Sequence, residues 1–255
     1  MPEPVIDILM YHSISDRSGP TCIPPEVFAG QMRVLAESGL PVISLDDLVA
    51  SRDASVRLAP HAVIVTFDDG FQDFADAAWP VMEPLGIRPI VYLPTGHIGG
   101  AEGWRGGTEP PRPLMGWGTI RALAREGVAF GSHTVTHADL DALTGDMLEA
   151  ELRRSQQEIA DQLDRPVHHF APPYGIAGDP VRRRVAAYYQ TSVGTRLGQA
   201  DAGSDLHDLP RLEMFYFTDL GHWRRHLDGR GATYLARRKA MRAVRGAVMK
   251  PWQGV

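Results

Sequence analysis

Short apolar runs alternate with helical segments along this chain of 255 residues, and this alternation constrains the fold more than any other feature. The apolar runs that we interpret as strands lie at residues 5–11, 41–45, 61–67, 88–93, 128–131, 167–170, 190–193 and 209–214. The stretches between them favour helices, for example at residues 25–38, where Phe28 and Met32 fall on one face. Because strands that alternate with helices form parallel βα units, the sequence predicts an α/β fold, either a barrel or an open sheet.

Residues with catalytic or metal-binding side chains follow the ends of these runs. They are His12, Asp68, Asp69, His133 and Tyr174. In parallel βα folds, ligands bind at the carboxyl ends of the strands. We therefore expect these residues to lie around one shared site.

Two adjacent carboxylates end the run at residues 61–67. Neighbouring residues of a strand point to opposite faces, so Asp68 and Asp69 reach one site only if the chain turns there. Gly70 allows such a turn. Adjacent carboxylates also repel one another unless a cation or a shared proton offsets the charge. A solvated turn is the alternative interpretation, since Asp-Asp-Gly is common turn chemistry.

A pair of histidines, His133 and His137, stands at positions i and i+4. On a helical turn the two rings would share a face and could bind one metal ion. Mixed histidine and carboxylate ligands suit zinc and similar divalent ions. With Asp69 as the third ligand, open positions would remain for water and substrate, and Asp68 would be free to act as a base on that water.

Composition places the chain among single-domain globular proteins. The length suits one large α/β domain, and 44% hydrophobic residues can bury a sizeable core. The single cysteine, Cys22, excludes an internal disulfide and fits a reducing compartment. The first residues lack the pattern of a signal peptide, and no apolar stretch reaches the ~20 residues that span a bilayer. We therefore expect a soluble, cytoplasmic protein.

Charge is distributed unevenly along the chain. Residues 221–255 carry nine Lys or Arg and one acid, whereas residues 1–220 carry 17 bases and 30 acids. We interpret residues 1–220 as the catalytic domain and residues 221–255 as a basic, helical extension. A solvated helix is one interpretation of this extension, and peripheral docking on an anionic membrane surface is another. Nucleic acid is not an expected partner, because the rest of the chain is acidic.

Three motifs, in this order, resemble one known family. FDDG at residues 67–70, HTVTH at 133–137 and PPYG at 172–175 are similar to the first three motifs of the polysaccharide deacetylases, the NodB-homology fold of carbohydrate esterase family 4. LMYHSI at residues 9–14 and LPRL at 209–212 resemble the exopolysaccharide-type branch of that family.

The resemblance covers residues 5–212 and implies a single-domain, distorted (β/α)7-type barrel. It also implies an activity, the removal of an N-acetyl group from an amino sugar with one divalent metal ion, zinc or else cobalt or nickel. The implied metal ligands are Asp69, His133 and His137. Asp68 is then the catalytic base, and the backbone N–H of Tyr174 helps to hold the oxyanion.

Two departures from the family pattern concern catalysis. The third motif often begins with an arginine that contacts the catalytic aspartate, but Ala171 stands there. Arg211 is our candidate replacement, and a surface arginine is the alternative. The late Leu-x-His motif that supplies the general acid is also missing, which leaves His12, His207 and His222 as candidates. We favour His12, because it follows a strand and a histidine pKa suits protonation of a leaving amine, although it could instead be a structural histidine.

Sugar contacts are expected from Trp104, Pro173 and Tyr174. Trp104 lies in a long loop rich in glycine and proline, residues 94–116, which we expect to cover the site. Trp117 begins an apolar-faced helix, so we expect it to pack in the core.

The leading functional hypothesis is a deacetylase that acts on an N-acetylated saccharide or on a lipid-linked sugar intermediate. A deformylase or an amidase acting on another C–N bond is the first alternative. A catalytically inactive saccharide-binding module is the second. The missing arginine and histidine favour the inactive module, whereas the intact acid pair and histidine pair argue against it.

Overall fold

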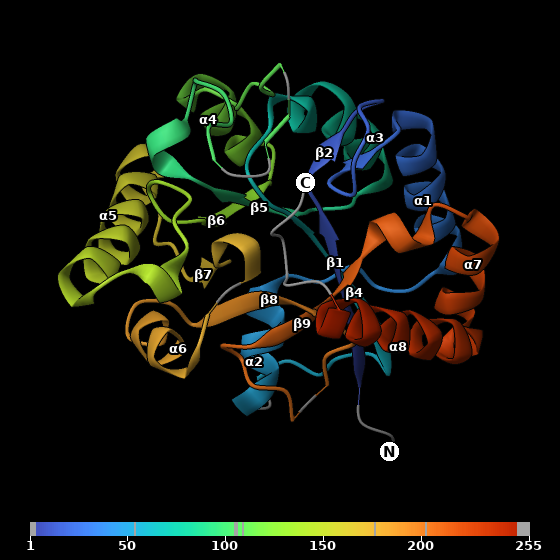
Figure 1. Ribbon diagram of the computed structural model, residues 1–255. Coiled ribbons are helices and arrows are strands. Elements are labelled where there is room, and N and C mark those ends of the chain that lie inside the picture. The colour runs from blue at the N-terminus through green and yellow to red at the C-terminus, as the bar shows by residue number, and fades with distance from the viewer. Residues whose placement is uncertain are drawn as a thin grey trace.

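Parallel strands close into a barrel in the computed structural model of the chain, which describes residues 4–53, 55–104, 107–108, 110–175, 177–201 and 203–248, with side chains as far as residue 244. Within these residues the strand order is β1-β4-β5-β6-β7-β8-β9, and β9 pairs with β1 to complete the ring. The barrel strands are β1 (Val5–Tyr11), β4 (His61–Phe67), β5 (Ile90–Leu93), β6 (Ala129–Ser132), β7 (His169–Phe170), β8 (Thr191–Leu197) and β9 (Leu209–Glu213). The prediction of a (β/α)7-type barrel is therefore confirmed (Figure 1).

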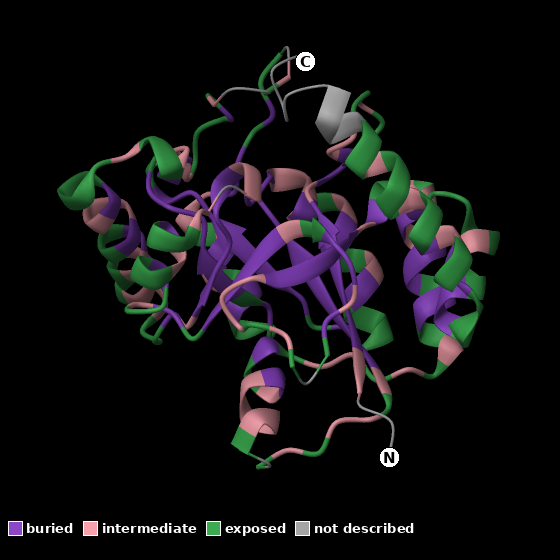
Figure 2. Cartoon of the chain, turned by 60° about the horizontal axis from the view of Figure 1, so that its bottom comes forward, coloured by how far each residue is buried: buried purple, intermediate pink, exposed green. Residues whose placement is uncertain are grey.

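Helices surround the strands in Figure 1. They are α1 (Pro25–Ser38), α2 (Leu45–Ala50), α3 (Trp79–Met82), α4 (Trp117–Arg125), α5 (Gly145–Leu163), α6 (Asp179–Val185), α7 (Leu220–Arg225) and α8 (Ala232–Val248). A small two-stranded sheet, β2 (Ser13–Ile14) with β3 (Cys22–Ile23), lies in the connection that follows β1. Figure 2 shows buried residues along the strands and exposed residues on the outer faces of the helices.

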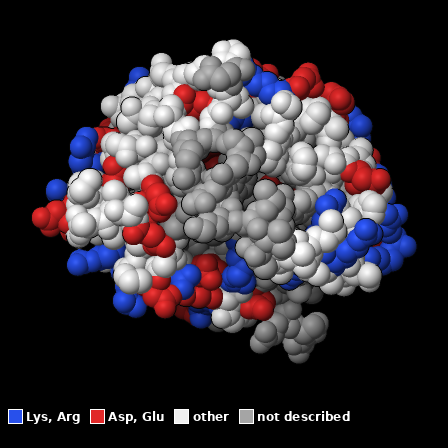
Figure 3. All heavy atoms as spheres, viewed as in Figure 1, with Lys and Arg blue, Asp and Glu red and all other residues white. Residues whose placement is uncertain are grey.

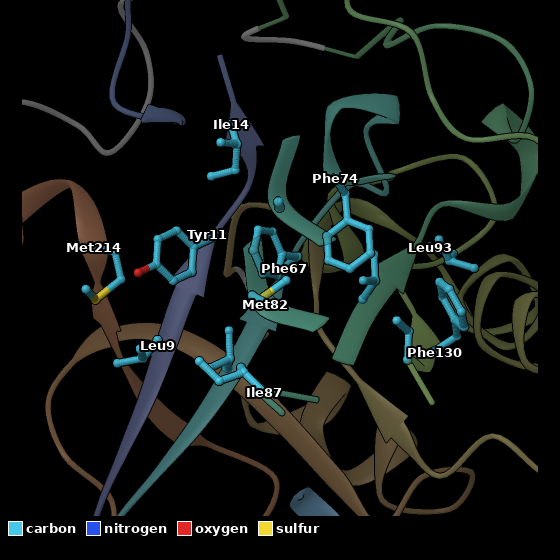
Figure 4. Close-up of a cluster of buried hydrophobic side chains, with 14 of the residues drawn as sticks. Leu9, Tyr11, Ile14, Phe67, Phe74, Met82, Ile87, Leu93, Phe130 and Met214 are labelled. Atoms are coloured by element: carbon cyan, nitrogen blue, oxygen red, sulfur yellow. The ribbon is translucent and has the colours of Figure 1, made fainter. Parts of the chain in front are cut away.

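Alternate residues of the strands face two different cores. Ile6 and Ile8 of β1 cluster with residues of β4, β5, β8 and β9, so they point into the barrel, where helix α2 joins them and closes the end at which the strands begin. Leu9 and Tyr11 point outward and pack with the surrounding helices. Figure 4 shows this outer cluster, in which the Tyr11 ring stacks on that of Phe67 with centroids 5.1 Å apart.

The register of the strands brings their carboxyl ends to one edge. Tyr11 pairs with Phe67, and Ser132 pairs with Phe170. The next residues along these four strands, which emerge at this edge, are His12, Asp68, His133 and Ala171. The expectation that strand ends share one site follows directly from this register.

Our prediction of a strand at residues 41–45 is wrong. Within this stretch only Val42 forms a bridge, an isolated parallel one to Val63 of β4. Ser44 then caps α2, because its Oγ accepts the N–H of Asp47 at 3.0 Å while the Asp47 carboxylate accepts the N–H of Ser44 at 2.9 Å. This capping box starts a helix at the next residue, so a strand cannot continue.

The domain boundary that we predicted between residues 220 and 221 falls inside α7, and described residues on its C-terminal side pack on the barrel. Trp223 is completely buried. His226 reaches β1, where its Nε2 lies 2.9 Å from Oδ2 of Asp7. Leu235 of α8 is buried as well, so the outer core continues into this segment.

The described residues of this segment, 221–248, are largely helical and basic on their surface. In Figure 3, Lys and Arg gather on the right-hand side, where Figure 1 places α7 and α8. Met241 and Val244 of α8 are exposed among them. In the described part of the chain, no helix is long and apolar enough to cross a membrane. Contact of this surface with an anionic membrane stays a prediction.

Candidate active site

The two adjacent aspartates end β4 and share one pocket. The Asp68 N–H donates to the Tyr11 carbonyl at 2.9 Å, which extends the pairing of β1 with β4 by one residue. The chain then turns sharply, because Asp69 and Gly70 have left-handed φ values of 74° and 69°. A Cβ at residue 70 would lie 2.7 Å from the Leu93 side chain, so glycine also provides necessary space. Both carboxylates are buried and line the same pocket.

Arg211 of β9 holds Asp68 in a bidentate ion pair. Nη1 donates to Oδ1 and Nη2 donates to Oδ2, both at 2.7 Å. Nε donates to the Gly194 carbonyl at 2.8 Å, and Nη1 also reaches Oγ1 of Thr66 at 3.0 Å. Burial raises the pKa of Asp68, but the charge and hydrogen bonds of Arg211 outweigh burial and hold that pKa below its usual value. Arg211 therefore keeps Asp68 ionised. Ala171, which stands where the family motif often has an arginine, has no side chain that could make this ion pair.

Asp69, His133 and His137 bring three potential ligand atoms together. Nε2 of His133 and Nε2 of His137 lie 3.4 and 3.2 Å from the same Oδ1 of Asp69, and the three atoms lie within 4.8 Å of one another. All three residues are buried. Burial raises the pKa of Asp69, but hydrogen bonds from the two histidines outweigh it and hold the pKa well below its usual range.

The segment between the two histidines is not helical, so the helical turn that we considered for this pair does not form. Thr134 and His137 have left-handed φ values of 70° and 56°. Glu151 of α5 holds this loop, because its Oε2 accepts the N–H of Val135 at 2.7 Å and that of Thr136 at 3.0 Å. The loop, not a helix, brings the two imidazole rings together, with centroids 4.9 Å apart.

The PPYG segment follows β7 and reaches the histidine pair. Tyr174 and Gly175 have φ values of 59° and 67°, and a Cβ at residue 175 would lie 2.2 Å from Oγ1 of Thr195. The Tyr174 ring meets that of His137 edge-on, with centroids 4.8 Å apart. Tyr174 lines the pocket, whereas Pro173 is buried and is not among the described residues that line it. Of these two predicted sugar contacts, Tyr174 therefore lies in the pocket wall, and a direct sugar contact stays a prediction.

Of the three histidines considered as general acid, His12 reaches the pocket. Its Nε2 lies 3.8 Å from Oδ2 of Asp68, and its side chain is 20% exposed. Nε2 of His207 lies 2.9 Å from the carbonyl oxygen of Tyr189, and His222 lies on α7. Neither of these two is among the described residues of the pocket wall.

Trp104 covers one side of the site. Its ring stacks on that of His137, with centroids 4.2 Å apart and planes 19° from parallel, and it lines the pocket. The loop that carries it folds back on the acidic turn, since the Met115 N–H donates to the Gly70 carbonyl at 3.0 Å. Trp117 packs against the outer core at the start of α4, as predicted.

Two charged pairs in the pocket region were missed by sequence reasoning. Glu102 and Arg112 form a buried ion pair within the covering loop, with Nη2 2.7 Å from Oε2, and Arg112 lines the pocket. Glu213 and Arg242 line it elsewhere, with Nη1 3.5 Å from Oε2. Glu213 could have been found, because it lies two residues after Arg211 and so on the same strand face. Nothing in the sequence pointed to Arg242.

Comparisons with known sequences agree with this geometry. The family model described as polysaccharide deacetylase matches residues 55–193, which is more than half of the chain. The Bacillus subtilis protein YxkH, whose name assigns it to the polysaccharide deacetylases, is 23% identical over 210 residues. That match covers 82% of this chain and 71% of YxkH.

Solved structures share the barrel. The Streptococcus pyogenes deacetylase PplD, in complex with acetate, matches with a TM-score of 0.73 at 25% identity, over 82% of this chain and 92% of PplD. IcaB from Ammonifex degensii has the same fold, with a TM-score of 0.72 at 19% identity, over 88% of this chain and 98% of IcaB. The chain therefore belongs to the polysaccharide deacetylase family, whose members are hydrolases of carbon–nitrogen amide bonds.

Proposed function

We propose that this protein is a metal-dependent hydrolase that removes an N-acetyl group from an amino sugar in a saccharide or a lipid-linked glycan intermediate. One observation carries the proposal: three potential ligands from Asp69, His133 and His137 converge beside an ionised carboxylate, Asp68, that Arg211 holds in place. Membership of the polysaccharide deacetylase family supplies the reaction class.

The donor set fits one divalent ion. Nδ1 of His133 lies 2.7 Å from the Ala171 carbonyl and can donate to it, which would leave the Nε2 lone pair directed at the site. Two imidazole nitrogens and one carboxylate oxygen match the preference of zinc, and cobalt or nickel would also be accommodated. When bound, the ion would polarise the acetyl carbonyl and lower the pKa of a water molecule.

Asp68 is placed to accept a proton from the attacking water. It is buried and ionised, and Arg211 occupies both of its oxygens, so the carboxylate keeps one orientation. Nε2 of His12 lies 3.8 Å from Oδ2 of Asp68 in the same pocket, and we assign to it the proton that the departing amine receives. We assign the backbone N–H of Tyr174 to the oxyanion, because the left-handed turn of that residue places it in the pocket wall.

The remaining pocket residues suit a sugar. The Trp104 ring and the Tyr174 ring both lie against His137 and offer aromatic faces and edges to a pyranose. The two motifs that resemble the exopolysaccharide-type branch supply His12 and Arg211, which both contact Asp68. A substrate of the exopolysaccharide type is therefore part of the proposal.

Acetate release from N-acetylglucosamine oligosaccharides tests the proposal. We expect release by protein reconstituted with zinc and none after chelation. Asp76→Asn, at an exposed aspartate outside the pocket, is the matched control for variants of Asp68 and Asp69. Formate release from an N-formyl substrate in the absence of acetate release would favour a deformylase. Sugar binding without any release would favour an inactive binding module.

A further inference from the structure

Helix α8 reaches the active-site pocket, although it lies far from the family motifs in the sequence. Its Arg242 lines the pocket that also contains Asp68 and His12. Glu213, the partner of Arg242, ends β9, where it is in register with Met10 of β1, another pocket residue. The basic C-terminal segment therefore contributes a cation to the wall of the substrate site.

The position of Arg242 is fixed by the helix that carries it. Leu235 is buried in the outer core, and the Tyr234 hydroxyl donates to the Tyr216 carbonyl. Arg238, one turn before Arg242 and on the same face, donates from Nε to the Tyr234 hydroxyl at 2.9 Å and lies 4.9 Å over the Tyr216 ring. These contacts hold α8 against the barrel up to the turn that contains Arg242.

Arg242 makes fewer and longer contacts to protein acceptors than the other two arginines near the site. Arg211 is fully buried and has both Asp68 oxygens as partners. Arg112 donates to Glu102 through Nε and Nη2. Its Nη1 donates to Oγ1 of Thr21 at 3.2 Å and to Sγ of Cys22 at 3.3 Å. In the described part of the chain, Arg242 makes one long contact of 3.5 Å to Glu213, and its side chain is 30% exposed. Among the described residues, no acceptor other than Glu213 lies within hydrogen-bond distance of its N–H groups.

A guanidinium with a single long contact to a carboxylate, in the wall of the substrate pocket, suits an anion. The planar fork of arginine matches the oxygens of a phosphate or a carboxylate, and such hydrogen bonds are stronger than neutral ones. The whole chain has a formal net charge of −5, so a cation in the pocket wall would favour the approach of an anionic sugar. Glu213 neutralises the charge of Arg242 in part and contacts it through Nη1. The other edge of the guanidinium can still attract an anion.

We propose that Arg242 is a specificity-determining residue, which binds an anionic substituent, a phosphate or a carboxylate, on the acetamido saccharide that this enzyme deacetylates. The inference rests on the proposed function and names its substrate class. Glu213 has the opposite effect, because its charge opposes the same anion. The two residues therefore predict changes of opposite sign, which a purely structural pair would not produce.

The test compares two substrates that differ at the anomeric substituent, which is an anionic phosphate in one and a neutral methyl group in the other. N-acetylglucosamine 1-phosphate and methyl N-acetylglucosaminide are assayed for acetate release at low salt, and a third substrate with a uronate neighbour separates carboxylate from phosphate. The readout is the ratio of kcat/KM for the anionic substrate to that for the neutral one, since a general loss of folding or catalysis cancels in this ratio. Arg242→Gln should lower the ratio by about tenfold or more, mostly through KM, as expected for a charged hydrogen bond.

Two further variants sharpen the comparison. Glu213→Gln should raise the same ratio, because it removes the opposing charge. Arg237→Gln is the matched control, since it removes one exposed arginine from the same helix outside the pocket, and it should leave the ratio unchanged. A ratio that is unchanged in Arg242→Gln, or one that falls equally in Arg237→Gln, overturns the proposal while leaving the deacetylase function intact.

Calorimetric binding to the Asp68→Asn variant separates this inference from the proposed function. One outcome is that the wild type deacetylates neither sugar while Asp68→Asn binds the phosphorylated sugar more tightly than the neutral one. If Arg242→Gln then removes this preference, the anion site stands and the proposed reaction fails. If the phosphorylated sugar binds no more tightly than the neutral one, Arg242 is not a specificity residue.

Discussion

Replacement of Arg211 by methionine removes the clamp on Asp68 and should both destabilise the protein and impair catalysis. The variant loses four hydrogen bonds, two to Asp68 and one each to Gly194 and Thr66. Arg211 is 1% exposed and Asp68 is 3% exposed, so the carboxylate would be left buried without a partner. Breaking a buried pair in this way costs about 3–5 kcal/mol. At about 2–4 °C per kcal/mol for a chain of this size, the melting temperature should fall by roughly 10 °C.

The same variant should change the pH dependence of activity. Arg211 is the main group that lowers the pKa of Asp68 against the opposing effect of burial. Without it the pKa of this carboxyl rises, so the base is protonated over more of the acid range. The acid limb of kcat/KM should therefore move to higher pH. Arg211→Lys keeps the charge but loses the bidentate geometry, and its effects should be smaller.

Two controls connect the loss of stability to the buried charge. Arg224→Met removes an exposed arginine that pairs with Glu37 at 2.8 Å, and such a surface pair contributes less than about 1 kcal/mol. Adding Asp68→Asn to Arg211→Met should restore part of the lost stability, because the unpaired carboxylate is removed. The reasoning would be refuted by an Arg211→Met variant that has the melting temperature of the wild type and whose acid limb of kcat/KM lies at the same pH.

Three further predictions concern the metal, the C-terminal segment and acid stability. His133→Ala should lose stoichiometric metal by elemental analysis, and unchanged zinc would remove this ligand assignment. Truncation after Asp219 removes the buried Trp223 and should abolish the cooperative thermal transition, so a truncated chain that melts like the full one would contradict the packing. Burial raises the pKa of Asp7, but hydrogen bonds from His226 and His61 outweigh it and lower the pKa to about 2. Because the unfolded pKa is about 3.9, the unfolded chain binds protons first, and about 2 kcal/mol of stability should be lost as pH falls from about 5 to 2. Denaturant midpoints should show that loss in the wild type and not in Asp7→Asn.

The alternation of strands and helices was sufficient for the α/β class, and the family resemblance, not the local pattern, implied the barrel. The position of the acidic pair does depend on a local pattern, since the β-branched run that ends in Asp68 and Asp69 can form a buried strand and Gly70 supplies the left-handed turn. Parallel strands then place their ends together by geometry alone. The spacing of His133 and His137 predicted their proximity for the wrong reason, because a loop held by Glu151 from a distant helix brings the rings together.

The features that the sequence did not reveal depend on contacts between distant segments. The basic composition of residues 221–255 suggested an independent element, but composition does not show that Trp223 and Leu235 insert into the outer core. The location of Arg242 depends on that packing, so no local pattern could place it in the pocket. The pairing of Arg211 with Asp68 was proposed from a missing motif residue, and its bidentate geometry required the ring closure of β9 with β1.

The central claim is that Asp68 is the base of a metal-dependent deacetylation, and acetate release by Asp68→Asn at wild-type metal content tests it most directly. Zinc is measured on the same samples, so that loss of a ligand is separated from loss of the base. We expect the variant to retain one zinc per chain and to release acetate from N-acetylglucosamine oligosaccharides about 10²–10⁴ times more slowly than the wild type. Acetate release at the wild-type rate by zinc-replete Asp68→Asn would contradict the claim.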